Sequence, residues 1–265
     1  MILATLLVAL LPNPTPGPGG PYGDGHARLR LLSEETSLVP GDTLHLGVSF
    51  EIEPGWHLYW NGRNDTGLPI SVELRLPEGY TAGDILWPAP ERHLSPGNIL
   101  DHVYHDEVTL IVPVAVPQDA TPGRAVRISA LVNWLVCKDV CLPAHAEVSV
   151  TVPPRRPDPD AAPRFEAARS RLPRPLPPDA GIRLRWEGTT LRVDAPTARA
   201  LAFFPFLQCA KLSHPIEDGA SPSGSLALRV APADTGESPA VSGVLEVEAP
   251  AGPTFYIVRE AVPAP

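Results

Sequence analysis

The chain has 265 residues, a formal net charge of −9 and 43% hydrophobic residues, with 35 prolines and 21 glycines. The hydrophobic content supports a packed core and excludes wholesale disorder, and the acidic balance argues against a nucleic-acid partner, because phosphate binding needs a basic surface. The abundance of proline and glycine disfavours a long helical bundle and favours strands joined by turns.

Residues 1–11 are apolar apart from Thr5, and a spacer rich in proline and glycine follows to residue 25. As a helix, this apolar run would reach only about 16 Å, short of the ~30 Å hydrocarbon core of a membrane. Such a run is typical of a secretory signal, although no basic segment precedes it and no clean cleavage site follows. We therefore expect a periplasmic or otherwise exported protein with no stable membrane span, in which the signal-like residues 1–25 are cleaved or stay attached.

Strand and turn signals alternate from residue 27 to residue 152 at the intervals typical of a β-sandwich. Between residues 43 and 52 every second residue is apolar, which predicts that one face of that strand lies in a core. The predicted strands cover residues 27–32, 43–52, 70–76, 107–116, 124–136 and 146–152. The polar stretch from residue 87 to residue 106 is predicted to be a long loop.

Residues 154–179 are rich in proline, arginine and aspartate and form a predicted linker, with one short helix over residues 164–172. A second segment with strand patterning follows. Its predicted strands cover residues 182–186, 190–193, 201–206, 225–230, 241–248 and 255–258. The sequence therefore predicts an all-β protein with two antiparallel sandwiches, over residues 26–153 and 180–265.

Cys137 and Cys141 lie close together in the sequence, whereas the third cysteine, Cys209, stands alone. In an extended strand, residues four apart are separated by about 13 Å, far more than the ~6 Å between Cα atoms that a disulfide allows. A disulfide between them therefore requires residues 138–140 to form a tight turn. It would close so small a loop that it stabilises the fold little. The pair is either redox-active, an ordinary structural disulfide or two buried thiols.

Charged residues flank this pair. Lys138, one of only two lysines, adjoins Cys137 and would favour its thiolate, whereas Asp139 would oppose it. His145 follows Cys141 by four residues and could support a thiolate there instead. These neighbours leave open which of the two sulfurs attacks first.

Aromatic residues gather just before a polar turn. Trp56, His57, Tyr59 and Trp60 fall within five positions, and Trp134 precedes the cysteine pair. Such density indicates either packing in a core or an aromatic wall beside a site.

Two further groups have a structural and a functional interpretation. Asp101, His102, His105 and Asp106 could hold a metal ion if the loop folds around it, although solvated loop histidines are more common. Cys209 follows an apolar run and is predicted to be a buried small hydrophobic residue, with an intermolecular disulfide as the alternative.

Four motifs occur in order along the first sandwich. They are Gly55-Trp56-His57-x-Tyr59-Trp60, Asp65-Thr66-Gly67-Leu68-Pro69, Trp87-Pro88-Ala89-Pro90 and Trp134-Leu-Val-Cys137-Lys-Asp-Val-Cys141-Leu-Pro143. Together they resemble the N-terminal periplasmic region of the DsbD/ScsB thiol–disulfide interchange proteins, here without the membrane and thioredoxin-like domains. The resemblance is close over residues 27–152 and loose in the second sandwich. Within it, Gly62-Arg63-Asn64 stands where an Asn-Pro-Gly type turn is expected.

The resemblance implies two immunoglobulin-like antiparallel β-sandwich domains joined by the Pro-rich linker, with Cys137 and Cys141 as the redox pair of the first. The pair would take electrons from a membrane thiol–disulfide donor and reduce disulfides of oxidised exported proteins, with no cofactor and no metal. Residues 88–106 are the nearest candidate for a cap loop that shields the pair. The residues expected to shape the site are Trp56, His57, Tyr59, Trp60, Tyr104, Trp134, Lys138 and Asp139.

Two other functions remain as alternatives. The first is a non-catalytic immunoglobulin-like binding or scaffold protein whose Cys137–Cys141 disulfide is structural. The second is a histidine-rich metal carrier. The ease with which the disulfide is reduced separates exchange from scaffolding, and metal uptake that depends on His102 and His105 would indicate the carrier.

Overall fold

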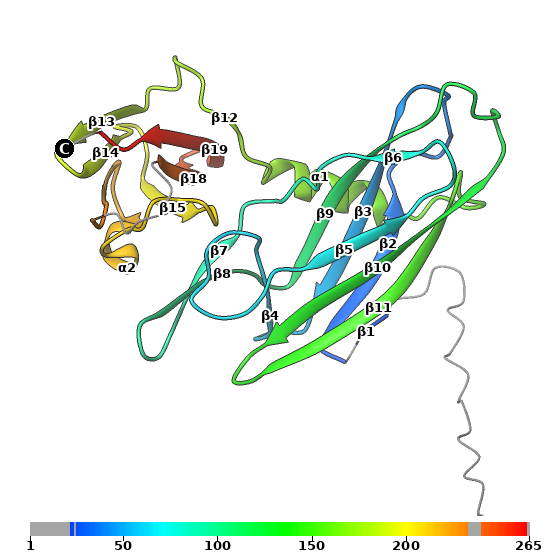
Figure 1. The fold of residues 1–265 in the computed structure, drawn as a ribbon, viewed down its shortest axis with the longest axis horizontal. Helices are drawn as coiled ribbons and strands as arrows, with labels where there is room; N and C mark the ends of the chain where they lie inside the picture. The colour runs from blue at the N-terminus through cyan, green and yellow to red at the C-terminus, as the bar shows by residue number, and fades with distance from the viewer. Residues whose placement is uncertain (1–21, 24, 233–239, 264–265) are drawn as a thin grey trace, which may run out of the picture.

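The computed structural model describes residues 22–23, 25–232 and 240–263 (Figure 1). The predicted signal-like segment falls outside the described residues except at its last positions. Strands predominate in the described part of the chain, which confirms the all-β prediction. Within these same residues, no helix is long and apolar enough to cross a membrane.

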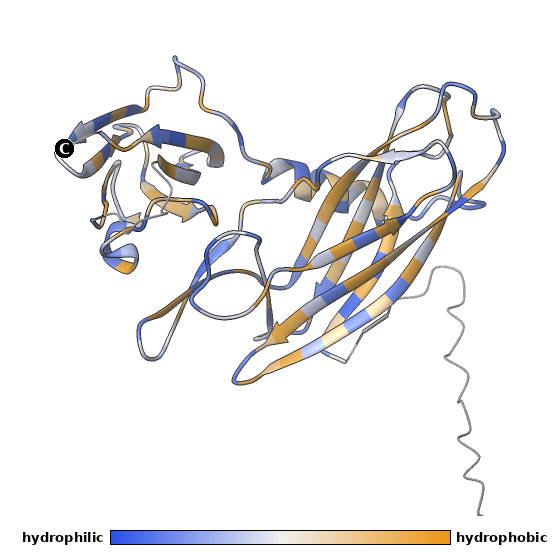
Figure 2. Cartoon of the chain, viewed as in Figure 1, coloured by the Kyte–Doolittle hydropathy of each residue, from blue (hydrophilic) through white to orange (hydrophobic). Residues whose placement is uncertain are grey.

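The first half of the chain contains two antiparallel sheets that enclose a core. One sheet has the strand order β1-β2-β3-β9-β6. Its strands are β1 (Tyr22–Gly23), β2 (Ala27–Ser33), β3 (Thr43–Ile52), β9 (Glu107–Ala115) and β6 (Thr81–Ala82). The alternating apolar residues of β3 are buried, as predicted, and Figure 2 shows this alternation as bands along the long strands.

The opposing sheet carries both cysteines of the pair, and we call it the cysteine sheet. Its strand order is β11-β10-β4-β8-β7, and β5 (Ser71–Arg75) also pairs with β10. Its main strands are β11 (Cys141–Val152), β10 (Val126–Cys137), β4 (His57–Tyr59), β8 (Ile99–Tyr104) and β7 (Glu91–Ser95). We call the side that faces the sandwich core the inner face and the opposite side the outer face.

The prediction of a long loop between residues 87 and 106 is wrong for the centre of this segment. Strands β7 and β8 form a hairpin there, and β8 is held between β7 and β4. Gly97 and Asn98 both have positive φ, which lets the chain reverse tightly between the two strands. The composition is polar because both faces of these strands carry titratable side chains: Glu91, His93 and Asp101 on the outer face, Arg92 and His102 on the inner face. This hid the strand pattern.

The predicted linker is anchored to the first sandwich by a helix. Helix α1 (Ala161–Ser170) begins three residues earlier than predicted and packs against β9 and β3. Phe165 is buried, and its ring lies so close to Gly47 that a Cβ at that position would be 2.9 Å from it. Arg164 donates to the Ser49 hydroxyl at 2.9 Å. The helix thus covers the face of β3 that is turned away from the sandwich core.

The second half also contains two sheets, ordered β12-β19-β18-β15-β16 and β13-β14-β17. The first comprises β12 (Arg174–Pro175), β19 (Gly252–Ala261), β18 (Ala240–Ala249), β15 (Ala200–Pro205) and β16 (Ala220–Ser221). The second comprises β13 (Arg183–Glu187), β14 (Thr190–Asp194) and β17 (Ser225–Arg229), and a short helix, α2 (Pro215–Asp218), precedes β16. Cys209 is fully buried in the core of this half, which confirms the prediction that it is a buried residue.

The two halves share an apolar contact. Phe203 belongs to the core of the second half, whereas its neighbour Phe204 packs in the cluster that contains Trp60. The turn after Trp60 strengthens this contact, because the Arg63 side chain donates to the carbonyl of Cys209 at 2.5 Å and its backbone N–H to the carbonyl of Pro205 at 2.9 Å. The departure from the family's turn thus brings an arginine to the second half. The division into two domains remains a prediction.

Candidate functional site

The Cys137–Cys141 pair closes a long hairpin. Strands β10 and β11 pair residue by residue from Val126 and Val152 to Cys137 and Cys141, which are the last pair before the turn. The Cα atoms of the two cysteines are 4.2 Å apart, and their sulfurs form a disulfide. Residues 138–140 form the tight turn that the sequence requires, with the Lys138 N–H donating to the Val140 carbonyl at 3.3 Å.

The strand register gathers titratable and sulfur-containing side chains on the outer face. In an antiparallel ladder, directly paired residues project from the same face of the sheet. Cys137 pairs with both Cys141 and His57, and Tyr59 pairs with Val103. On the next strand, Glu91 pairs with Val103 and His93 with Asp101. The outer face therefore carries Cys137, Cys141, His57, Tyr59, Glu91, His93, Asp101 and Val103.

The two sulfurs differ in their access to solvent. Cys137 is only 2% exposed and packs with Val103 and Tyr59, whereas Cys141 is exposed. A disulfide is attacked at one sulfur while the other leaves. Access alone therefore makes Cys141 the sulfur that another protein can reach.

A chain of hydrogen bonds leads from the exposed sulfur to a buried carboxylate. The Tyr59 hydroxyl lies 3.6 Å from Cys141 Sγ and 3.3 Å from Thr66 Oγ1. Thr66 donates its backbone N–H and its hydroxyl to the carboxylate of Asp101, at 2.8 and 2.6 Å. Because the Thr66 proton is directed to Asp101, the Tyr59 hydroxyl donates either to Thr66 or to the sulfur. Burial raises the pKa of Tyr59, so its hydroxyl keeps its proton at neutral pH.

The Asp65-Thr66-Gly67-Leu68-Pro69 motif lies against the Tyr59 ring. A Cβ at Gly67 would come within 2.2 Å of this ring, and Gly67 has a φ of +66°. A side chain at this position would meet both a steric clash and a strained backbone. On the outer face, the Tyr59 ring thus lies between this loop and the cluster that it forms with Val103 and Cys137.

The charged residues at the hairpin tip are exposed. A Cβ at Gly55 would lie 3.5 Å from Lys138 Nζ, so the Lys138 side chain extends over the turn before β4. Asp139 is exposed, and so is His145, whose ladder partner is Asn133.

The predicted site residues separate between the two faces. His57 and Tyr59 lie on the outer face with the cysteine pair. Trp60, Tyr104 and Trp134 are buried in the core on the inner side, where the Tyr104 hydroxyl donates to the Pro88 carbonyl at 2.7 Å. Trp56 stacks on His26 with ring centroids 3.7 Å apart and packs partly against the core.

Sequence reasoning missed Thr66 and Val103 and considered Asp101 only as a metal ligand. Alternation along β8 could have placed Val103 and Asp101 on one face, had the strand been recognised. Nothing in the sequence pattern indicates the contact between Thr66 and Asp101, which are 35 residues apart.

The metal site considered as an alternative at Asp101, His102, His105 and Asp106 does not form, because His102 and His105 lie on opposite faces of the sheet. His102 is buried on the inner face, where its Nδ1 lies 2.5 Å from the Arg63 carbonyl oxygen. His105 instead approaches His57 and His93 on the outer side, with ring centroids 5.9 and 5.5 Å away. One ring nitrogen from each of these three histidines lies within 4.8 Å of the others.

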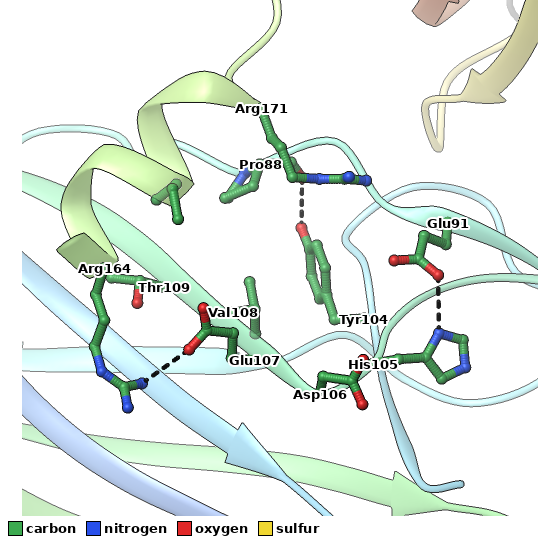
Figure 3. Close-up of a pocket in the computed structure, with 12 residues that line it drawn as sticks. Pro88, Glu91, Tyr104, His105, Asp106, Glu107, Val108, Thr109, Arg164 and Arg171 are labelled. Atoms are coloured by element: carbon green, nitrogen blue, oxygen red, sulfur yellow. Dashed lines mark hydrogen bonds and ion pairs between the residues drawn. The ribbon is translucent and has the colours of Figure 1, made fainter. Parts of the chain in front are cut away.

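A cavity of about 360 Å³ adjoins this cluster, between α1 and the strands β8 and β9. Figure 3 shows the Tyr104 ring at its centre and Arg164 and Arg171 entering from the helix. Two pairs of titratable groups lie in its wall, with Arg164 3.7 Å from Glu107 and His105 Nδ1 3.2 Å from Glu91.

The fold and the cysteine pair define a β-sandwich protein with a disulfide on one sheet face. Residues 28–153 match the family model described as "Thiol:disulfide interchange protein DsbD, N-terminal". Residues 28–153, just under half of the chain, are thus recognised as a DsbD N-terminal domain.

Solved structures extend the similarity in fold. The N-terminal periplasmic domain of ScsB from Proteus mirabilis has a TM-score of 0.60 and 14% identity, over 91% of this chain and 95% of that chain, so the likeness includes the second half. The reduced N-terminal domain of DsbD from Neisseria meningitidis is 18% identical, over 43% of this chain and 81% of that chain, with a TM-score of only 0.28. A comparison with curated proteins gives no match.

Proposed function

We propose that this protein is an exported thiol–disulfide exchange module, a protein-disulfide reductase component that uses Cys137 and Cys141. The observation that carries this proposal is the asymmetry of the disulfide, which exposes Cys141 at a hairpin tip and buries Cys137 behind it. The electron donor is a membrane thiol–disulfide protein, and the acceptors are oxidised exported proteins. The chemistry requires only the two cysteines.

Reduction of the pair begins at the exposed sulfur. A thiolate of the donor attacks Cys141 Sγ, the bond to Cys137 breaks, and Cys137 leaves as a thiolate that takes up a proton. The second thiolate of the donor then attacks the donor sulfur that is bonded to Cys141, and Cys141 leaves as a thiolate. Two electrons have passed, so that the donor holds a disulfide and this protein holds two thiols.

Transfer of electrons to an exported client protein uses the same sulfur, Cys141 Sγ. The Cys141 thiolate attacks a disulfide of the exported protein, one client sulfur leaves as a thiolate, and a mixed disulfide forms. The Cys137 thiolate then attacks Cys141 Sγ and releases the reduced client. The Tyr59 hydroxyl supports these steps, because a protonated donor 3.6 Å from Cys141 Sγ stabilises the thiolate form.

The surroundings of Cys141 support docking of another protein. Val140 and Leu142 flank it along the chain, and both side chains are exposed. Leu68, in the loop that covers Tyr59, is also exposed. Apolar side chains around a reactive group provide area that a partner can bury.

Access to Cys141 requires no large rearrangement. The segment expected to form a cap contains the paired strands β7 and β8, and Tyr104 at the end of β8 is anchored in the core. We infer that Val103 and the Gly67 loop shield Cys137, while Cys141 stays open to both donor and client.

The first test is the reduction potential of the Cys137–Cys141 disulfide, measured in glutathione or dithiothreitol buffers with thiol trapping and mass spectrometry. A potential of about −120 to −270 mV, the range of exchange proteins, supports the proposal. A value below about −300 mV is that of a resistant structural disulfide. That result would overturn the proposal in favour of an immunoglobulin-like binding or scaffold protein.

A trapping experiment tests the assignment of the attacked sulfur. Cys137→Ser leaves Cys141 free and should accumulate mixed disulfides with small disulfides or exported proteins. Cys141→Ser leaves only the buried Cys137 in the site and should form them at least about tenfold more slowly. Equal rates would remove the basis for this assignment.

A further inference from the structure

We propose that His57, His93 and His105 form a binding site for a divalent transition-metal ion of the Zn²⁺ type, beside the cysteine pair. The inference does not rest on the proposed exchange activity, and the spacing of histidines in the sequence did not predict this site. Two strands and a strand end supply it: β4 provides His57, β7 provides His93, and His105 directly follows β8.

The register of the sheet explains why these three residues meet. His57 and His93 are outer-face residues, and His105 follows β8 at the position that continues its outer-face alternation. The ring centroids of His57 and His93 are 4.6 Å apart, and both rings lie within 6 Å of His105. Neighbouring strands of one sheet therefore present the three imidazoles as a preformed group.

The geometry requires only side-chain adjustment to bind an ion. One nitrogen from each ring lies within 4.8 Å of the other two. Zinc–nitrogen bonds of about 2.0–2.1 Å in a tetrahedron place ligand atoms roughly 3.4 Å apart. The nitrogens must therefore approach one another by at most about 1.4 Å, which rotation of the rings can provide. Three histidines with an open fourth position are a donor set that zinc uses in proteins.

Glu91 supplies the supporting carboxylate that metal-bound histidines commonly have. Its Oε2 lies 3.2 Å from His105 Nδ1 (Figure 3). With Nδ1 directed to the carboxylate, Nε2 is the nitrogen of His105 that can bind the metal. Such carboxylate–histidine pairs fix the orientation of the ring and raise its basicity.

The direct test is titration of the full chain, with its disulfide oxidised, with Zn²⁺ at neutral pH in an isothermal calorimeter. Oxidation removes Cys137 and Cys141 as ligands, and Cys209 is fully buried. We expect one ion per chain with a Kd in the micromolar range or below. His93→Ala should weaken binding at least tenfold, and so should Glu91→Gln, because loss of a supporting carboxylate typically costs about 10–100-fold in metal affinity.

Two control variants distinguish this site from other histidines. His145→Ala removes an exposed outer-face histidine outside the cluster and should leave Zn²⁺ binding unchanged. His45→Ala tests the other group whose ligand atoms lie close together, Glu34, Glu35 and His45, and should also leave binding unchanged. Absence of binding up to millimolar Zn²⁺, or loss of binding in His45→Ala but not in His93→Ala, would overturn the proposal. His93 is half-buried, so its variant tests the site without opening the core.

Discussion

The inner and outer faces of the cysteine sheet belong to the same strands and have opposite character. Leu58 and Val136 project inward and are completely buried in the main core. His57 and Cys137, one residue away on the same strands, project outward into the proposed site. Because alternate residues of a strand point to opposite sides, one face can vary while the other holds the fold. The Cys137–Cys141 disulfide thus lies on a rigid support.

The histidines show the same contrast. His102 on the inner face and His57 on the outer face both have a pKa lowered to about 4, mainly by burial. His102 is fixed by the Arg63 carbonyl and by the surrounding rings of Trp60 and Phe204. His57 faces two other imidazoles instead. Although both side chains are buried, His102 has a structural role on the inner face, whereas His57 is a candidate metal ligand on the outer face.

Among the variants that test this contrast, Trp134→Ala should have the largest effect on stability. The ring packs edge-on against Phe50 inside the core, so its removal should lower the free energy of unfolding by about 3–5 kcal/mol. Urea denaturation monitored by circular dichroism measures this loss. The outer-face variant Tyr59→Phe, which keeps its ring, should change stability by less than about 1 kcal/mol. Similar losses in both variants would mean that the two faces do not differ in this way.

Much of the first sandwich could be predicted from its own sequence. β3 was predicted with its observed bounds, because its period-two pattern is uninterrupted. The hairpin turn at residues 138–140 was predicted as the condition for a disulfide, from strand geometry alone. Both depend on residues close together in the chain.

What the sequence could not provide depends on contacts between distant segments. β7 and β8 look like a polar loop because both faces carry charged side chains, and Asp101 and His102 of β8 become buried only through contacts with distant segments. Likewise, nothing local distinguishes Trp60, which faces the core, from Tyr59, which faces the sulfur. The three-histidine cluster combines residues 57, 93 and 105 through strand register. No spacing rule in one segment could have shown it.

Acidification should sharpen the contrast between the two histidine environments. The pKa of His102 is lowered from 6.5 to about 4 in the folded protein. The unfolded chain therefore binds this proton first, and the stability due to His102 is complete above pH 6.5 and falls as the pH drops towards 4. The expected loss is up to about 3 kcal/mol, since each pKa unit corresponds to about 1.36 kcal/mol.

The variant His102→Asn isolates this effect, because an amide can still donate to the Arg63 carbonyl but does not titrate. Urea unfolding at several pH values between 7 and 4 should show a shallower decline in the variant than in the wild type. The remaining slope includes His57, whose pKa is also about 4. Parallel declines in the two proteins would contradict the assignment to His102.

Reduction of the disulfide should have a smaller effect on stability. Cys137 and Cys141 are already paired at the end of the β10–β11 ladder, and the loop between them is only three residues long. By the loop-entropy relation, cross-linking so short a loop contributes at most about 2 kcal/mol. Urea unfolding of the oxidised and the dithiothreitol-reduced protein measures the difference. A loss of about 4 kcal/mol or more would indicate a structural disulfide and oppose the exchange function.

Tyr59→Phe should produce the smallest effect, confined to the thiol chemistry. The ring still packs with Val103 and Cys137, while the hydroxyl 3.6 Å from Cys141 Sγ is lost. A hydrogen bond to the thiolate that contributes about 1 kcal/mol corresponds to a rise of about 0.7 units in the pKa of Cys141. The pH dependence of iodoacetamide alkylation, followed by mass spectrometry in a Cys137→Ser background, measures this pKa.

The matched control is Tyr80→Phe, which removes a tyrosine hydroxyl from a half-buried ring packed against the core. It should leave the pKa of Cys141 unchanged. Equal alkylation profiles for the Tyr59 and Tyr80 variants would show that the hydroxyl at position 59 does not act on the sulfur. A rise in the pKa of Cys141 only in the Tyr59 variant would mean that the Tyr59 hydroxyl stabilises the thiolate of the exposed sulfur. Tyr59 would then have two roles, because its ring also packs with Val103 and Cys137.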